Sequence, residues 1–168
     1  MHASDARRPS GLALFAVGLV LAALAGCSKA PDSPSADQPA ASHHEHLAPH
    51  GGTLIALGDH QFNLELVHDA TQGRLSAYIL DAHAEKFVRI PLREFSLIAL
   101  VKGEREVLTM AAVANAGTGE TVGDTSEFVA QAPWLKYKVA FDALIPALEI
   151  RGATFEEIRF AFRSGSKS

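Results

Sequence analysis

The sequence predicts an all-β domain, an antiparallel immunoglobulin-like sandwich of about seven to nine short strands. Three observations lead to this fold class. Apolar and polar residues alternate with a period near two from residue 52 onward, short runs are separated by Gly, Asp and Asn, and no amphipathic helix pattern of any length occurs there. A small closed barrel is the alternative that the same pattern allows.

Ahead of this domain, residues 1–26 have the form of a signal peptide. Arg7 and Arg8 make a positive start, and the apolar run 12–25 is too short for a membrane span of about 20 residues. The run ends in Leu24-Ala25-Gly26-Cys27, which resembles the bacterial lipobox. The resemblance implies cleavage before Cys27 and acylation of that cysteine. An uncleaved anchor with an incidental cysteine is the alternative.

Lipidation at Cys27 would place the domain in the cell envelope, anchored to a membrane and facing the periplasm. Ser28, rather than Asp, follows the cysteine, which favours the outer membrane over the inner one. Cys27 is the one cysteine in the chain, so the folded part is expected to hold neither a disulfide nor a thiolate ligand. Residues 27–49 are expected to be a lipidated cysteine and a flexible linker, because Pro, Ser, Ala and Asp dominate up to residue 42.

The folded domain is expected at residues 50–163, with a frayed tail at 164–168. Strands are predicted at 53–57, 62–66, 75–81, 95–101, 107–113, 126–130, 135–141, 147–150 and 158–162, with a short extended piece at 87–90 and a long polar loop at 115–126. Trp134, which follows Pro133, is expected to plug one end of the core. The predicted core residues are Phe62, Leu64, Ile79, Phe95, Leu97, Tyr137, Val139, Phe141, Ile158 and Phe160.

The charge balance and the motifs exclude several function classes. The chain has a formal net charge of −4 and therefore lacks the excess of basic residues that nucleic-acid binding proteins use to contact phosphates. The sequence shows no defensible nucleophile–base pair and no glycine loop with phosphate-binding spacing, so we expect a protein that is not an enzyme.

Four histidines lie within eight residues, His43, His44, His46 and His50. Imidazole binds zinc, copper or nickel as the neutral base, so the tract is a candidate transition-metal site, with Zn or Cu expected. It is not a zincin helix motif, because residue 48 is alanine and Pro49 would break the helix. The alternative is a solvated His-rich spacer without a ligand role.

An up-and-down strand order predicts where the remaining histidines lie. His68, in register with buried Leu64 and Leu66, is expected with Asp69 at the same pole as His50 and is a candidate fifth ligand. A second group is expected at the opposite pole: His60, Asp81, His83 and Glu85.

The start of the domain resembles a known family. The matching residues are Pro49-His50-Gly51-Gly52, Leu54, the Gly58-Asp59 turn, Leu64-Glu65-Leu66 and Tyr78. They are similar to the histidine-flanked β-domain that precedes the core of periplasmic adaptor subunits of heavy-metal efflux systems, over about residues 49–90. The resemblance implies metal handling, with His50 on the shared motif. The chain departs from the adaptors because it has no coiled-coil hairpin or lipoyl-like segment.

Two functions are therefore expected. The first is a lipid-anchored envelope protein that binds transition-metal ions and is accessory to metal efflux or homeostasis, with efflux components as partners. The alternative is a non-catalytic immunoglobulin-like interaction or structural module that carries a His-rich spacer.

Overall fold

The all-β prediction is confirmed by a computed structural model that describes residues 47–137 and 140–164. The described residues form eight strands and one short 3-10 helix, and none of their helical segments has the length and apolar character needed to cross a bilayer. In chain order the elements are β1 (Thr53–Leu57), β2 (Phe62–Asp69), β3 (Arg74–Asp81), β4 (Glu94–Val101), β5 (Glu104–Ala112), β6 (Glu127–Gln131), η1 (Pro133–Lys136), β7 (Ala140–Ile150) and β8 (Ala153–Arg163).

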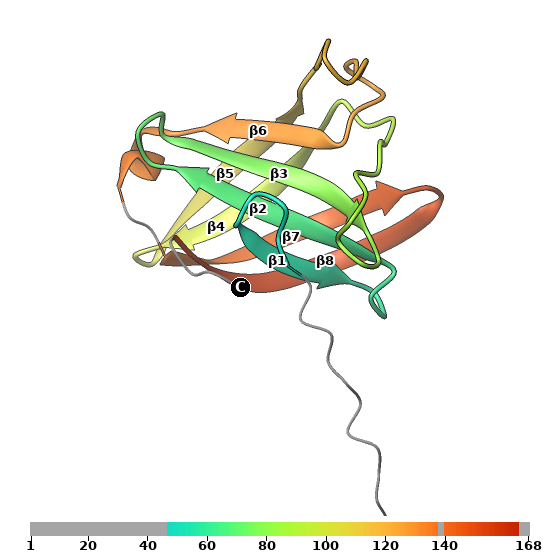
Figure 1. The fold of residues 1–168 in the computed structure, drawn as a ribbon. Helices are drawn as coiled ribbons and strands as arrows, with labels where there is room; N and C mark the ends of the chain where they lie inside the picture. Colours follow the sequence, from blue (N-terminus) through green and yellow to red (C-terminus); the bar gives the residue numbers. More distant parts are fainter. Residues whose placement is uncertain (1–46, 138–139, 165–168) are drawn as a thin grey trace, which may run out of the picture. The chain divides into compact units, whose positions relative to one another are not determined.

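All eight strands belong to one antiparallel sheet in the order β1-β2-β3-β6-β5-β4-β7-β8 (Figure 1). The two halves of the sheet meet where β5 pairs β6, in a ladder of only two residue pairs, Ala111 with Val129 and Ala112 with Phe128. The outer strands β1 and β8 come into contact at the other end, but no ladder among the described residues joins them. The sheet is therefore nearly closed around one core.

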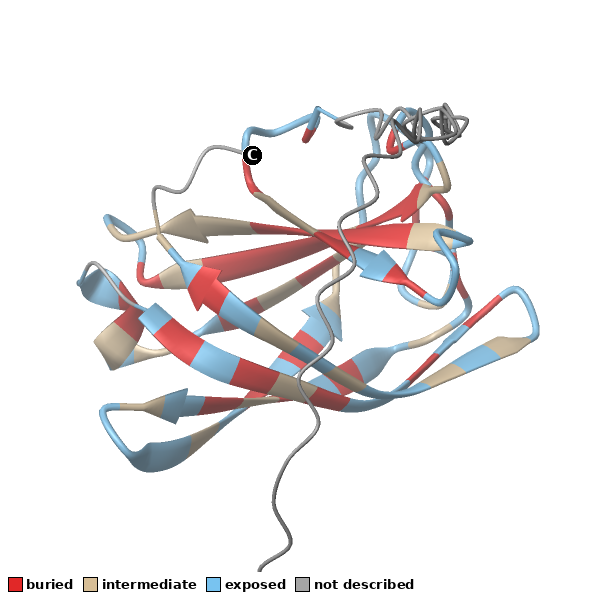
Figure 2. Cartoon of the chain, turned by 90° about the horizontal axis from the view of Figure 1, so that it is seen from below, coloured by how far each residue is buried: buried red, intermediate tan, exposed pale blue. Residues whose placement is uncertain are grey.

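The core lies on the inner face of this sheet, and buried positions alternate with more exposed ones along β4, β5 and β7 (Figure 2). Leu64 and Leu66 on β2 and Leu97 on β4 are fully buried. Aromatic rings join the strands, with Phe141 stacked on Phe162 at a centroid distance of 4.9 Å. Apolar burial of this kind stabilises a fold by roughly 25 cal/mol per Å² of apolar surface.

The predicted strand at 135–141 is wrong over its first part. Pro133–Lys136 forms the helix η1, and β7 begins only at Ala140, because Pro133 at the first helical turn favours a helical start. Tyr137, predicted in the core, is 71% exposed, and Val139 lies outside the described residues. Trp134 packs edge-on against Phe141 at 5.5 Å, as expected for an end plug.

Two hairpins close through two-residue turns. Lys102 and Gly103, between β4 and β5, have φ of 52° and 88°. Arg151 and Gly152 repeat the arrangement between β7 and β8, with φ of 51° and 82°. Positive φ at both central residues is the type I′ geometry that matches the twist of paired strands.

Candidate functional site

The segment before β1 folds back onto the outer face of β2 and β3. The Gly51 N–H donates to the Ala48 carbonyl at 3.0 Å, which closes a tight turn with Pro49 and His50 at its centre. Pro49 suits the second position of a type I turn, and Gly51 adopts a φ of +68° that a residue with a side chain would resist. This turn carries His50 away from the line of β1.

Glu65 is the residue onto which the turn closes. Its neighbours Leu64 and Leu66 face the core, so Glu65 points to the opposite face of β2, where it is nevertheless fully buried. Its Oε1 accepts the N–H groups of His50 and Gly52 at 2.8 and 2.9 Å, and its Oε2 lies 2.9 Å from Nδ1 of His50. A buried carboxylate needs such donors to offset its lost hydration.

Gly52 is required by close packing. A Cβ added to Gly52 would lie 2.4 Å from the Leu66 carbonyl oxygen and 2.9 Å from Cγ2 of Val67. Only glycine lets the chain approach β2 closely enough for its N–H to reach Glu65.

The His50 ring lies on an aromatic surface. It stacks on Tyr78 with centroids 4.0 Å apart and planes 23° apart, and it meets Phe87 at 5.5 Å. Tyr78 faces the same side as Glu65 because the two are cross-strand partners. Burial, together with the charge of Glu127, raises the pKa of Tyr78 above its ordinary 10.0, so the neutral phenol donates to Oε1 of Glu127 at 3.0 Å.

The two ring nitrogens of His50 have different roles. A carboxylate can only accept hydrogen bonds, so Nδ1 carries the proton that it donates to Glu65. In the neutral ring this leaves the lone pair on Nε2. Within the described ranges no hydrogen bond occupies Nε2, and the side chain is 37% exposed. Histidines that bind metals typically donate their other N–H to a carboxylate in this way.

His68 does not join His50. His68 follows Glu65 by three residues on β2, and an odd separation along a strand places two side chains on opposite faces. The His68 side chain therefore lies on the inner face of β2. Its Nε2 donates to the Leu135 carbonyl at 2.6 Å, and its ring meets the edge of Phe162 at 6.3 Å. The structure does not bring the two histidines together, because His50 lies on the outer face of β2 and His68 on its inner face.

The acidic residues predicted at the two poles stabilise turns. Oδ1 of Asp69 accepts the N–H groups of Thr71 and Gln72. Burial alone would raise the pKa of Asp81, but N–H donors from Glu85 and Lys86 outweigh it and hold the pKa below 3.8. Residues 47–137 and 140–164 contain no group of three or more His, Cys, Asp or Glu placed to hold a metal ion. His43, His44, His46 and Cys27 lie outside the described residues.

Sequence reasoning missed the roles of Glu65, Tyr78 and Phe87. Alternation along β2 indicated that Glu65 points away from the core, but it could not show that another segment covers it. A signal was present in the motif itself, because His50, Gly52, Glu65 and Tyr78 belong to the residues that carry the family resemblance and here they meet in one place.

Comparisons with known proteins add no assignment. No protein-family model matches the chain, and neither a curated protein nor a solved structure matches it.

Proposed function

We propose that this protein binds a transition-metal ion, Zn²⁺ or Cu²⁺, with Nε2 of His50 as the ligand held by the fold. The hydrogen bond between His50 Nδ1 and Glu65 supports this proposal more than any other observation. The carboxylate fixes the tautomer with a free lone pair on Nε2 and makes the imidazole a stronger base. Partners of this kind change metal affinity by about 10- to 100-fold.

The other ligands would come from the tract, His43, His44 and His46. They precede His50 closely in sequence, and an extended chain spans at most about 3.3–3.6 Å per residue, so all three imidazoles have the reach to meet an ion bound at His50. Three or four imidazoles form a donor set that suits Zn²⁺ or Cu²⁺.

The proposed setting is the cell envelope. Acylation of Cys27 would anchor the chain to a membrane, the outer one in preference to the inner, and the domain would face the periplasm. There a bound ion would be buffered or passed on, as an accessory to metal efflux or homeostasis, in line with the family resemblance of residues 49–90.

A second candidate is a non-catalytic envelope module in which His50 has a structural role. The observation that favours it is the environment of His50, whose ring and N–H satisfy buried Glu65 and whose face covers Tyr78. These contacts would stabilise the domain without any ion.

Calorimetric titration of the full chain with Zn²⁺ and with Cu²⁺ separates the two candidates. We expect saturable binding at pH 7.5 that H50A weakens at least tenfold and that the quadruple alanine variant of His43, His44, His46 and His50 abolishes. Affinity should also fall below pH of about 6.5, where imidazoles generally protonate.

H68A is the matched control, because His68 lies on the opposite face and its Nε2 is committed to Leu135. It should bind metal as the unaltered chain does. If the unaltered chain binds neither ion, metal binding is contradicted and the non-catalytic envelope module remains as the function.

A further inference from the structure

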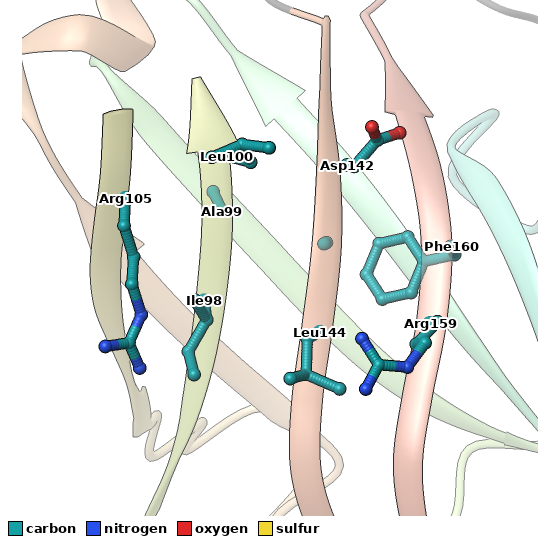
Figure 3. Close-up of a pocket in the computed structure, with 9 residues that line it drawn as sticks. Ile98, Ala99, Leu100, Arg105, Asp142, Leu144, Arg159 and Phe160 are labelled. Atoms are coloured by element: carbon teal, nitrogen blue, oxygen red, sulfur yellow. The ribbon is translucent and has the colours of Figure 1, made fainter. Parts of the chain in front are cut away.

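The outer face of the half-sheet β5-β4-β7-β8 carries a hollow of about 530 Å³ (Figure 3). Ile98 and Leu100 from β4 and Leu144 from β7 form its apolar floor. Leu100 is 49% exposed, and Val107 on the neighbouring strand β5 is 56% exposed. These positions alternate with core residues, where a solvated strand would ordinarily present polar side chains.

The opposite half-sheet shows what a covered outer face looks like in this protein. On the outward side of β2 and β3, Asn63, Glu65, Ser76 and Leu80 are all buried. The turn at His50 lies over that face, and the ring of Phe87, whose backbone pairs beside the end of β3, meets His50 and Tyr78 there. Among the described residues no equivalent segment lies over Leu100 and Val107, so this apolar surface is available to a partner.

The strand register orders the side chains of this face into two rows. One row runs Val107, Ile98, Leu144 and Arg159. The next runs Arg105, Leu100 and Asp142. The aliphatic surface is therefore bounded by Arg105 on β5 at one side and by Arg159 on β8 at the other, as Figure 3 shows.

The charge of this face differs from that of the chain. The whole chain has a formal net charge of −4, but the hollow is flanked by two guanidinium groups and lined by one carboxylate, Asp142. Arg105 makes no ion pair within the described residues, and Arg159 meets only exposed Glu157 at 3.4 Å. Both guanidiniums are available to donate two-pronged hydrogen bonds to carboxylates of a partner.

We propose that this face docks a partner protein through a segment whose apolar side chains are flanked by Asp or Glu. The aliphatic rows would bury the apolar side chains, and Arg105 and Arg159 would select the flanking acids and fix their spacing. Arginine at the edge of an apolar centre is a common composition of protein interfaces. The surface lies on strands other than those that hold His50, so the proposal stands apart from metal binding.

Selection of random 12-residue peptides on the full chain tests this directly. We expect the selected peptides to carry apolar residues flanked by Asp or Glu. The double variant R105E/R159E should lose these peptides and select ones flanked by Lys or Arg. L100S/V107S keeps both arginines and should bind the acid-flanked peptides at least tenfold more weakly, because truncating central apolar contacts commonly costs that much.

The chain offers matched controls for both changes. R93E/R151E reverses two exposed arginines elsewhere, and V122S alters a valine that is 46% exposed in a loop. Both should keep the original peptides. Circular dichroism and melting temperature show whether each variant is folded.

Three results would overturn the proposal. The first is a peptide set that R105E/R159E leaves unchanged. The second is a dimer in sedimentation that L100S/V107S dissociates, which would assign the face to a second copy of this chain. The third is flotation with phosphatidylglycerol vesicles that R105E/R159E abolishes in the delipidated chain, which would assign the face to a membrane.

Discussion

His50 presents two unlike nitrogen atoms to its surroundings. Nδ1 is committed to a fully buried carboxylate, whereas Nε2 meets no partner among the described residues. The sequence around the residue explains how this comes about, because Pro49 favours the turn, Gly51 permits its left-handed exit and Gly52 permits the close approach to β2. Three neighbours thus hold one imidazole in a defined orientation.

Replacing Glu65 by Gln should reverse the tautomer of His50. The two backbone N–H groups would retain the amide oxygen, so the amide NH₂ would face Nδ1 and require it to accept. The proton would then move to Nε2 and block metal ligation. We expect E65Q to lower Zn²⁺ affinity about 10- to 100-fold, measured by calorimetry, with the tautomer read from the imidazole ¹⁵N shifts.

E127Q is the control for E65Q, because Glu127 lies on the same face and bonds Tyr78 rather than His50. It should leave the ¹⁵N shifts of His50 and the Zn²⁺ affinity unchanged. An E65Q protein that keeps Nδ1 protonated would contradict the tautomer argument.

The two glycines of the motif should differ in their response to alanine. At Gly51 an added Cβ meets nothing within 4 Å, so G51A should cost only the left-handed backbone, about 1–2 kcal/mol. At Gly52 the Cβ would strike the Leu66 carbonyl, and the turn would have to leave Glu65. We expect G52A to be the more destabilising in urea denaturation, and equal losses would argue against a tightly docked turn.

At the scale of elements, β2 performs two tasks with its two faces. Leu64 and Leu66 fill the core, while Glu65 between them anchors the turn before β1. Alternation is what permits this division, since successive side chains of a strand point to opposite sides. The loop 115–126 has a comparable anchor of its own.

Glu120 provides that anchor by accepting donors from two sides of the loop. Its Oε1 accepts the Ser126 N–H and hydroxyl at 2.9 and 2.6 Å, and its Oε2 accepts the Thr118 hydroxyl at 2.7 Å. The Arg89 guanidinium lies 3.7 Å away. Burial alone would raise the pKa of Glu120, but these donors and the arginine outweigh it and lower the pKa below 4.5.

The depressed pKa of Glu120 predicts a loss of stability in acid. The stabilisation is fully present above pH 4.5, the ordinary pKa, and it is lost as the pH falls through the lower pKa of the folded state. We expect E120Q to cost about 1–3 kcal/mol at pH 7 and progressively less below pH 4.5, measured by urea denaturation at each pH.

Exposed Glu104 supplies the comparison, and E104Q should change stability by less than about 0.5 kcal/mol at either pH. A cost of E120Q that stays constant down to pH 3 would show that the carboxylate charge is not what orders the loop.

At the scale of the whole molecule, one sheet encloses the core and leaves a seam between its ends. β1 and β8 lie close to each other, and the hollow between them is lined by residues such as Leu57 and Ile158. Charged residues along β8, including Glu156 and Arg159, are of the kind that discourages pairing of an exposed edge with another chain.

The open seam predicts a pattern of amide hydrogen exchange. Amides of β1 and β8 that point into the seam have no ladder partner in the part of the chain that the structure describes, so they should exchange far faster than those of the central strands β3 and β6. Nuclear magnetic resonance after transfer to D₂O measures both sets. Protection of the seam amides equal to that of β3 would mean that β1 and β8 are paired in solution.

The sequence alone was sufficient to predict where most strands lie and most of the core, although the strand predicted at 147–150 is the end of β7. The alternation of apolar and polar residues can be seen within a short stretch of sequence, without knowledge of distant contacts. Turn residues such as Lys102-Gly103 then mark where the strands end. The same local reasoning failed at 135–137, because period-two spacing over a few residues does not distinguish a strand from a single helical turn that begins at Pro133.

The candidate site was only half predictable for the same reason. His50 stood out by its neighbours in sequence, but its partners Glu65, Tyr78 and Phe87 come from β2, β3 and the segment after β3. Which face the turn covers, and that His68 lies on the other, depends on how strands distant in sequence pair. Composition and periodicity determined that a histidine precedes a β-domain, and long-range pairing alone decided which of its nitrogens is held and which remains available.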